Sequence, residues 1–544
     1  MQLWPHWFEA VVQRHRLHRV VVLAYVACVV LFLVSLAQFY IPGKGFSYLI
    51  SFGATQEGTR ISKVRRLDRH VERASAGYDA QFYVQIAMDP SLRNSQLPHA
   101  VDSLPYRGRR ILFATTAYLL GLGHPVWILQ AFALQNALAW LLLAALLLHW
   151  FPPRSWDNFL RWAGVLFSLG LCLSVRNALF DGPSLLVIAF GLYLLDRGQP
   201  WAAAAVLGLG GLGKETNLLG ATALAPPWRG GRSVWGTTIL RGLLVAVPFG
   251  LWLVYLGATV GPVADAGRRN FSLPFVGYMH HWQDLVAVWP NLSWADPNAL
   301  WNLLSLLALT VQFLFLALRP RWHEAWWRVG AGFAVLLIFI GDAVWEGYPG
   351  AATRVLLPMQ LAFNVLVPAG RGWRIVLLLG NLTLLAAPPS LQAPLDDGQI
   401  KGPSTLLFSH DGEPVTLQSE RGWYSPEGGG SDTWVWTTGP ALLSIDNPKP
   451  EAMEFRLRFG LSSAGHRTIR VVLNGATIWR TELSDRDVAT ASLLGQRLNS
   501  GRNTLEFISD EPACTVGIDP RPLAFSVRNL RIDLQRLLPP AATR

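Results

Sequence analysis

The chain has little cysteine and few charged residues, and both shortages narrow what it can be. Of its 544 residues three are cysteines, and two of them, Cys28 and Cys172, lie in apolar runs. These three provide no disulfide framework, which leaves an extracytoplasmic location open, because domains there do not require disulfides. Charged residues make up 15% of the chain and hydrophobic residues 51%. Since soluble domains carry about a quarter charged residues, this composition predicts a membrane protein.

Signatures of several enzyme classes are also missing. The sequence contains no Walker loop, no dinucleotide-binding glycine fingerprint and no nucleophile elbow, and the run Gly208–Gly213 is interpreted as helix packing. Residues 395–544 hold 16 Lys and Arg against 18 Asp and Glu, whereas the preceding residues hold 30 against 17. Because the positive excess falls in the apolar part, it predicts membrane topology and phosphate binding, with no nucleic-acid partner.

Apolar runs long enough to cross a bilayer begin with Val20–Ile41 and recur to about residue 387. A basic flank before the first run places the N-terminus in the cytoplasm, and the later basic short loops fall on the same side. The pattern predicts a polytopic α-helical membrane domain, residues 1–395, with about eleven membrane segments. This count takes the run Trp201–Pro226, interrupted at Gly213–Asn217, as two. Residues 42–110 form a long first outer loop. Within it, the basic stretch Arg60–Arg73 is interpreted as a solvated helix face, or as a contact for anionic lipid or phosphate.

The composition changes after Pro388-Pro389. Short runs that alternate apolar and polar residues follow, from Ser404–Phe408 to Leu523–Val527, with turn signals between them. The dipeptide Asn474-Gly475 between two such runs is a strong hairpin signal. Residues 396–544 are therefore predicted to form an extracytoplasmic β-sandwich domain of jelly-roll type.

Four polar clusters interrupt the apolar part, and the predicted topology puts them all on the outer side. They are Asp79 with Tyr106–Arg110, Arg176 with Asp181, Lys214 with Glu215, and Glu346 with Arg354. Because charges in or beside membrane segments are costly, four clusters on one face predict a shared cavity that opens outward. The alternative is four independent ion pairs that fix helix packing. For Asp79 alone, the alternative is a helix cap.

Four short motifs carry a family resemblance. They are Tyr78–Tyr83, Tyr106–Leu112, Leu212–Thr216 and Arg354–Pro358, in that order along the chain. Their order and spacing resemble the GT-C superfamily of integral-membrane glycosyltransferases, in particular the bacterial relatives of the protein O-mannosyltransferase and aminoarabinose-transferase group. In that group an acidic residue follows the first span, here Asp79. Close relatives commonly have Gly where this chain has Ala80. The resemblance covers roughly residues 15–390 and leaves out the C-terminal domain.

The resemblance implies transfer of a sugar from a polyprenyl-phosphate carrier to an acceptor hydroxyl on the outer, periplasmic side of the bacterial inner membrane. Asp79 would act as the general base, and Glu215 and Glu346 would orient the cations that hold the lipid phosphate. Those cations are Arg109, Arg110, Lys214 and Arg354. The other candidate substrate-binding residues are Tyr78, Gln81, Tyr83, Asp102, Tyr106, Arg107, Arg176 and Asp181. The implied partners are membrane lipid, the lipid-linked sugar, and a glycan, lipid or protein acceptor, and no cofactor is expected.

A metal site is not expected either. Adjacent residues point in different directions on regular structure, so the pair His280-His281 is interpreted as a loop pair and not as two metal ligands. Two other functions stay open. A transporter or flippase for a lipid-linked sugar predicts symmetric halves with paired broken helices. A membrane-anchored glycan-binding protein would leave the charges Lys214 and Glu215 in an apolar run without an explanation.

Overall fold

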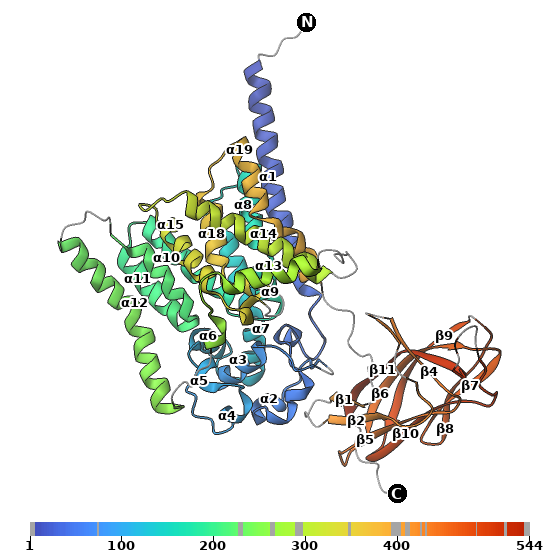
Figure 1. The fold of residues 1–544 in the computed structure, drawn as a ribbon. Coiled ribbons are helices and arrows are strands. Elements are labelled where there is room, and N and C mark those ends of the chain that lie inside the picture. The colour runs from blue at the N-terminus through green and yellow to red at the C-terminus, as the bar shows by residue number, and fades with distance from the viewer. Residues whose placement is uncertain are drawn as a thin grey trace. The chain divides into compact units, whose positions relative to one another are not determined.

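The computed structural model describes residues 6–72, 75–226, 232–261, 267–288, 297–345, 350–392, 404–408, 414–424, 427–429, 432–485, 487–515, 519 and 521–537. Contacts group the chain into two compact units. The first is Met1–Ile50 with Tyr78–Ala393, and the second is Ser51–Gly77 with Pro394–Arg544. The first unit is helical, and the C-terminal part of the second consists of strands (Figure 1).

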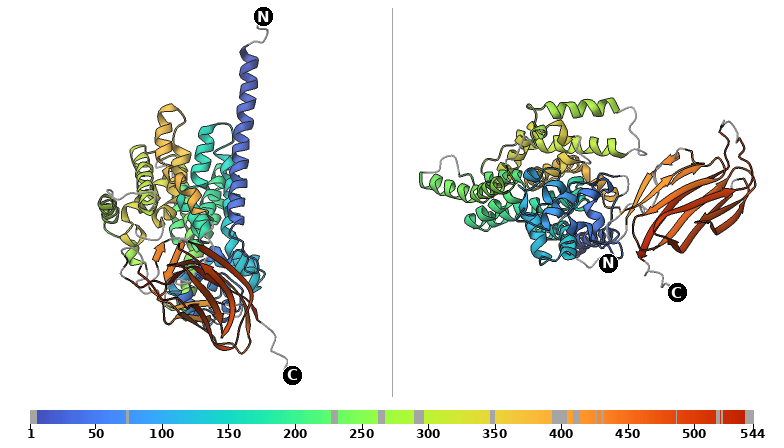
Figure 2. Two further views of the ribbon diagram at one scale, coloured as in Figure 1. Left: turned by 90° about the vertical axis from the view of Figure 1, so that its right-hand side faces the viewer. Right: turned by 90° about the horizontal axis from the view of Figure 1, so that it is seen from below.

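The first unit is a bundle of helices, in which η marks a 3-10 helix (Figures 1 and 2). Its elements are α1 (His6–Ala37), η1 (Ser47–Ile50), α3 (Ala80–Ala87), α4 (Leu97–Ala100), α5 (Leu104–Arg107), α6 (Ile111–Leu120), α7 (Pro125–Leu146), η3 (Leu147–His149), α8 (Trp156–Leu166), α9 (Leu169–Arg176), α10 (Asp181–Asp196), α11 (Pro200–Gly213), η4 (Glu215–Leu224), α12 (Arg232–Thr259), η5 (Arg268–Asn270), α13 (Val276–Val288), α14 (Pro297–Leu318), α15 (Ala325–Phe339), α16 (Asp342–Trp345), α17 (Ala351–Val355), α18 (Leu357–Leu366), α19 (Arg371–Leu379), η7 (Leu382–Ala386) and α20 (Ala387–Ser390).

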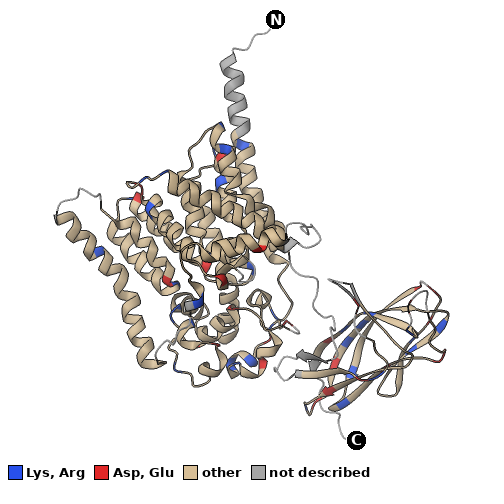
Figure 3. Cartoon of the chain, viewed as in Figure 1, with Lys and Arg blue, Asp and Glu red and all other residues tan. Residues whose placement is uncertain are grey.

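Several long apolar helices of this unit suggest a membrane protein. Within the described ranges, four helical stretches are long and apolar enough to cross a membrane: His18–Ala37, Pro125–His149, Ser233–Thr259 and Ala299–Leu318. The bent pair α8 and α9 makes a fifth if it is counted as one span. Figure 3 shows few charged residues along these helices. The helices agree with the predicted membrane character by their length and composition, while the count of eleven segments and the membrane side of each loop stay predictions.

Two buried tryptophans organise the core of the bundle beside α1. Trp140 of α7 stacks on Phe32 of α1 with 3.8 Å between ring centroids, and Trp162 of α8 lies 4.6 Å from Tyr25. A buried indole N–H needs an acceptor. Trp140 Nε1 donates to the carbonyl of Leu166 at 2.8 Å, and Trp162 Nε1 donates to that of Ala144 at 2.9 Å. These contacts fix α1, α7 and α8 against one another.

The apolar run that follows Pro200 is broken, as the sequence predicts. Helix α11 ends at Gly213, and the chain continues as the 3-10 helix η4 from Glu215. Lys214 between them has an extended backbone, with φ −161° and ψ 132°. Irregular backbone of this kind needs partners from the protein, and the side chain of Asn217 supplies one by donating to the carbonyl of Gly210 at 2.9 Å. The break therefore leaves the Lys214 and Glu215 side chains at the end of a helix.

The C-terminal domain consists of two antiparallel sheets. One has the order β1-β2-β5-β10-β7-β8 and the other the order β3-β4-β11-β6-β9. The strands are β1 (Ser404–Phe408), β2 (Pro414–Ser419), β3 (Glu427–Gly429), β4 (Asp432–Trp436), β5 (Ala441–Asn447), β6 (Met453–Ser463), β7 (Arg467–Leu473), β8 (Ala476–Leu483), β9 (Val488–Leu498), β10 (Gly501–Ser509) and β11 (Phe525–Leu537).

One hydrophobic cluster joins the two sheets of this domain. Buried residues of β6, such as Phe455 and Leu457, alternate with partly exposed ones and meet residues of the other sheet such as Phe507. The predicted hairpin at Asn474-Gly475 is confirmed: both residues have positive φ, 49° and 83°, and Leu473 pairs directly with Ala476. The antiparallel β character is confirmed, and the jelly-roll topology stays a prediction.

The segment Ser51–Gly77 matches the interpretation of its basic stretch as a solvated face at Lys63 and Arg66, which are exposed, and departs from it at two arginines. It contains only short helical turns, η2 (Ala54–Thr59) and α2 (Ser62–Arg65). Arg60 and Arg69 are buried, form ion pairs with Glu57, and lie over the ring of Phe52 at 4.8 Å and 5.5 Å. The prediction of a solvated or lipid-binding face is wrong for these two arginines, because their guanidinium groups are directed at a nearby carboxylate and at backbone carbonyls.

Candidate functional site

The motif around Asp79 lies in a compact loop structure that α12 supports. Trp252 Nε1 donates to the carbonyl of Gly108 at 2.8 Å, and the hydroxyl of Tyr255 donates to that of Ser91 at 2.7 Å. Asp79 itself precedes α3, but its side chain makes no capping hydrogen bond within the described residues. The interpretation of Asp79 as a simple helix cap is therefore wrong.

Arg107 connects two carboxylates of the first outer loop. Its Nε and Nη2 donate to the two carboxylate oxygens of Asp102 at 3.0 Å and 2.8 Å, and Nη2 also donates to Oδ1 of Asp79 at 2.9 Å. The guanidinium lies 5.2 Å from the centre of the Tyr83 ring. A planar guanidinium holds carboxylates in fixed orientations, so Arg107 positions Asp79.

The two carboxylates differ in how many of their oxygens are used. Both oxygens of Asp102 accept hydrogen bonds, and Oδ1 also accepts the backbone N–H of Ser103. Asp79 accepts one bond at Oδ1, and no described residue donates to its Oδ2. The Asp79 side chain is 39% exposed, so the second oxygen is accessible to a ligand. Asp79 is therefore the better candidate for a proton acceptor.

Cations determine the charge state of Asp79. Burial by itself would raise the pKa of this carboxyl, but the positive charges of Arg107, Arg354 and Arg110 outweigh burial, and its pKa lies below the usual value. The carboxylate is consequently ionised at neutral pH. A group with a lowered pKa is a weak base in the resting protein, so its basicity depends on how strongly the arginines hold it.

Arg110 joins the loop to the broken helix. Its Nε and Nη2 donate to the two carboxylate oxygens of Glu215 at 2.9 Å and 3.0 Å. The same guanidinium donates to the hydroxyls of Tyr83 and Tyr106, each at 3.1 Å. Arg109 is held less firmly, with its Nη2 3.8 Å from Glu215. Of these two arginines, Arg109 therefore has more donor capacity left for a ligand.

Asp181 at the start of α10 forms the other half of the cluster. It accepts a hydrogen bond from Lys214 Nζ and lies 3.4 Å from Nη1 of Arg354. Arg354 also donates from Nη2 to the hydroxyl of Tyr78 at 2.7 Å, next in sequence to Asp79. Asp181 is 8% exposed, so its two cationic partners balance a charge that has little access to solvent.

These contacts join most of the predicted residues into one network. It runs from Asp102 through Arg107 to Asp79, passes along the chain to Tyr78, and continues through Arg354 and Asp181 to Lys214. Five cations, Arg107, Arg109, Arg110, Lys214 and Arg354, face four carboxylates, Asp79, Asp102, Asp181 and Glu215. The excess of one positive charge and the tyrosine hydroxyls suit a ligand that contains a phosphate and hydroxyl groups.

The partners within the network differ from those that sequence neighbours predict. Lys214 pairs with Asp181 and not with Glu215, which pairs with Arg110. Gln81 lies in α3 and is 1% exposed, so it is buried beside the site. Glu346 lies outside the described residues, and its predicted pairing with Arg354 has no structural outcome.

Arg176 is separate from the Asp181 contacts. It donates to the hydroxyl of Tyr48 at 3.0 Å and lies over the rings of Tyr48 and Phe39, at 4.5 Å and 4.9 Å. None of the described carboxylates forms an ion pair with it, so the predicted pair of Arg176 with Asp181 is wrong. The sequence gives no signal for Tyr48 as its partner, because the two residues are 128 positions apart.

Other residues of the site were not found from the sequence. Phe180 packs on Tyr83 with 4.3 Å between ring centroids, and Asn270 donates to the hydroxyl of Tyr106 at 3.4 Å. Phe180 stands directly before the candidate Asp181, which is the only sequence signal for it. Both residues orient the tyrosines that contact Arg110.

The two adjacent histidines lie in helix α13, so the prediction of a loop pair is wrong, and they have separate partners. His280 Nδ1 lies 3.2 Å from Asp342, whereas His281 stacks on Trp345 with 5.1 Å between ring centroids. In the described part of the chain, no three His, Cys, Asp or Glu side chains are grouped so that they could hold a metal ion.

No family model matches the chain, and no curated protein matches it. About a quarter of the chain is similar to parts of solved structures, among them a carbohydrate-binding module. One is the family 35 module from Clostridium thermocellum, with 12% identity over 24% of this chain and 98% of that chain and a TM-score of 0.15. Others are a Podospora anserina GH26-CBM35 β-(1,4)-mannanase (14% identity over 23% of this chain, TM-score 0.15) and a family two carbohydrate esterase from C. thermocellum (11% over 24%, TM-score 0.15). The chain covers 26% and 34% of the lengths of these two enzymes. At such identities and TM-scores the similarity carries no argument about function.

Proposed function

We propose that this protein is a membrane glycosyltransferase that moves a sugar from a polyprenyl-phosphate carrier to an acceptor hydroxyl, on the periplasmic side of the bacterial inner membrane. The observation that carries the proposal is the network in which an accessible oxygen of Asp79 lies among arginines and a lysine. Charged networks at the ends of apolar helices are costly, so their presence supports a binding role for an ionic substrate. The resemblance of the four motifs to GT-C enzymes points to the same chemistry.

The proposed reaction has one proton transfer and one displacement. The acceptor hydroxyl gives its proton to Oδ2 of Asp79 while its oxygen forms a bond to the anomeric carbon. The bond from that carbon to the carrier phosphate breaks, and the electron pair leaves with the phosphate. The transition state resembles an oxocarbenium ion. Its stability therefore depends on how well the protein stabilises the negative charge that develops on the leaving phosphate.

The cations of the network have different roles, which depend on whether each has a carboxylate partner. Arg110, Lys214 and Arg354 each have a carboxylate partner, so they form a fixed positive background toward the phosphate. Arg109, 3.8 Å from its nearest carboxylate oxygen, has the capacity for a direct contact with the phosphate. Arg107 orients Asp79, and Asp102 in turn holds Arg107.

The test is a membrane-vesicle assay with polyprenyl-phosphate sugars, which compares the wild type with Asp79→Asn. Loss of the base is expected to reduce turnover by about 10²- to 10⁴-fold. The matched control is Asp157→Asn, which removes a carboxylate that pairs with Arg374 at 2.9 Å outside the network. The control should retain turnover.

Two results would contradict the proposal in different ways. Full turnover in Asp79→Asn would remove Asp79 as the base. Absence of transfer from every carrier sugar by the wild type, with movement of labelled lipid-linked sugar between leaflets, would establish a transporter.

A further inference from the structure

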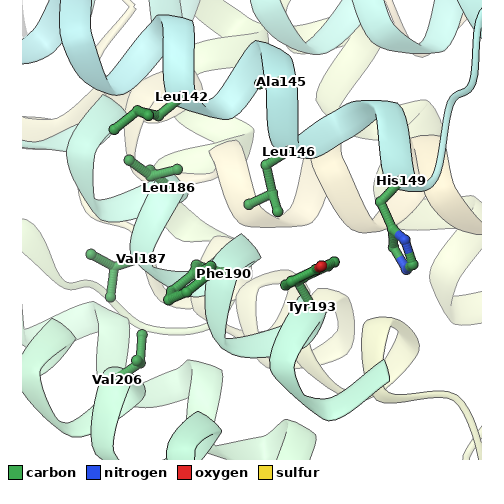
Figure 4. A pocket seen from close by; sticks show the side chains of 9 residues that line it. All are labelled: Leu142, Ala145, Leu146, His149, Leu186, Val187, Phe190, Tyr193 and Val206. Atoms are coloured by element: carbon green, nitrogen blue, oxygen red, sulfur yellow. The ribbon is translucent and has the colours of Figure 1, made fainter. Parts of the chain in front are cut away.

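A cavity lies away from the ionic network, between α7, α10 and α11. It has a volume of about 630 Å³ and is lined by nine residues, seven of which are aliphatic or phenylalanine. Figure 4 shows Leu186, Val187 and Phe190 of α10 facing Leu142 and Leu146 of α7 across it. The volume lies within the range of roughly 300–1,000 Å³ that small-molecule sites occupy. The cavity is therefore large enough for an apolar ligand.

The apolar rim of the cavity indicates what surrounds it. Leu142 and Phe190 line it and are 50% and 41% exposed. Leu138 of α7 and Leu209 of α11, on the helices that border it, are 48% and 50% exposed. The stretch Pro125–His149 is a candidate membrane span, so these side chains face lipid. Water inside would find few polar partners, whereas acyl chains of the bilayer have direct access.

One end of the cavity is polar and aromatic. His149 and Tyr193 line it there, with 5.1 Å between their ring centroids. His149 Nε2 lies 3.4 Å from Asp196, and the guanidinium of Arg197 lies 5.9 Å from the centre of the Tyr193 ring. Aromatic and charged side chains at the end of an apolar span are typical of the level of lipid headgroups.

The polar end of the cavity and the ionic network lie toward opposite ends of α10. Asp181 is the first residue of this helix, whereas Tyr193 lies in its last turn. With a rise of about 1.5 Å per residue, the two are about 18 Å apart along the axis. A lipid headgroup beside Tyr193 is consequently separate from a phosphate held near Asp181.

We infer that this cavity binds one acyl chain of a bilayer phospholipid, with the glycerophosphate end of the lipid beside His149 and Arg197. The bound chain fills the space between α7, α10 and α11 and becomes part of their packing. The site goes beyond the proposed transfer reaction, because it needs no substrate and its polar end lies at the other end of α10 from Asp181.

The test measures phospholipid bound to the purified full-length protein by native mass spectrometry, after extensive washing with detergent and after titration with dioleoyl phosphatidylglycerol. The wild type is expected to retain or rebind about one phospholipid more than Leu142→Trp, in which the indole fills the cavity. Leu138→Trp is the matched control, because Leu138 lies one turn earlier on α7 with nearly the same exposure and does not line the cavity. A second variant, Ala145→Phe, fills the cavity from an exposed lining position.

Competitors identify the recognised part of the lipid. A single-chain lysophospholipid should displace the bound phospholipid, and glycerol phosphate without a chain should not. Equal binding by wild type, Leu142→Trp and Ala145→Phe would overturn the inference, as would an equal loss in Leu138→Trp. Preferential binding of polyprenyl phosphate would also overturn it. None of these readouts requires sugar transfer, so the inference and the proposed function fail independently.

Discussion

At the scale of single residues, the Arg110 side chain stands out for the number of hydrogen bonds it makes. It contacts both oxygens of Glu215 and two tyrosine hydroxyls, and its side chain is 16% exposed. Removing one partner of such a pair leaves the other charge without compensation, which is more harmful than removing both.

Arg110→Met is therefore expected to destabilise the helical unit by about 2 kcal/mol, at the lower end for buried pairs because Glu215 is 27% exposed. The apparent melting temperature in detergent measures it. The double variant Arg110→Met with Glu215→Gln should recover part of the loss. If the double variant is less stable than Arg110→Met, the loss in the single variant does not arise from an uncompensated charge on Glu215.

The pH dependence of Asp79 follows from the direction of its pKa shift. Its pKa in the folded protein is lowered below the unfolded value of about 3.9. A lowered folded pKa means that ionised Asp79 contributes stability above about pH 4 and that this contribution is lost as the pH falls further. Melting curves of the wild type between pH 3 and 7 should show an acid-side loss that is smaller in Asp79→Asn. An Asp79-dependent transition near pH 6 would contradict the argument.

Single residues also show where sequence reasoning ends. The four polar clusters show which residues are polar where the chain is otherwise apolar, and Asp79, Asp181, Lys214 and Arg354 were predicted from them. They do not indicate the partners, because the pairs join positions 33, 105 and 173 residues apart. Neighbours such as Lys214 and Glu215 were paired in the prediction because they are adjacent, whereas the rotation of each helix decides the actual partner.

At the scale of helices, the end of α11 depends on a close contact with α6. A Cβ added at Gly213 would lie 2.5 Å from Cε2 of Phe113, whose ring is 6% exposed. Neither side has room to move, and Lys214 follows directly. The position of this lysine beside Asp181 therefore depends on the absence of a side chain at residue 213.

Gly213→Ala is expected to cost about 1–3 kcal/mol through overpacking and to reduce sugar transfer by displacing Lys214. The control Gly236→Ala lies in α12, where an added Cβ meets nothing within 4 Å. It should leave the melting temperature unchanged or raise it slightly, since Ala favours helix more than Gly. Unchanged transfer and stability in Gly213→Ala would show that α6 and α11 adjust to the methyl group.

Element boundaries followed from local patterns, and the lateral order of the elements did not. The break before Glu215 and the strand Ser404–Phe408 were predicted from the sequence and are present. The position of β10 between β5 and β7 was not predicted, because it requires pairing of strands far apart in sequence. Alternation indicates one buried face of a strand but not the neighbour that covers its edge.

At the scale of the whole molecule, the two units have separate cores. The β domain buries Phe455, Leu457 and Phe507 in a cluster that both of its sheets share. A change in that cluster should act on this unit alone, since distant sites without shared partners contribute independently.

Phe455→Ala is expected to destabilise the β domain by about 3–5 kcal/mol and to leave the unfolding of the helical unit unchanged. Differential scanning calorimetry of the full chain measures both transitions. The exposed position Thr490, on β9 of the same sheet, supplies the control Thr490→Ala. A single transition that shifts as a whole would mean that the units unfold together.

Helix α10 is a continuous helix whose first residue, Asp181, contacts Lys214 and Arg354, and whose last turn borders the cavity beside His149. A continuous helix moves as one rigid element, so a change of tilt at one end also moves the side chains at the other end. Ligands that prefer different tilts would change each other's affinities, and thermodynamic reciprocity makes the coupling equal in both directions. If the cavity holds a phospholipid as inferred above, binding of that lipid would therefore change the affinity of the ionic network for its ligand.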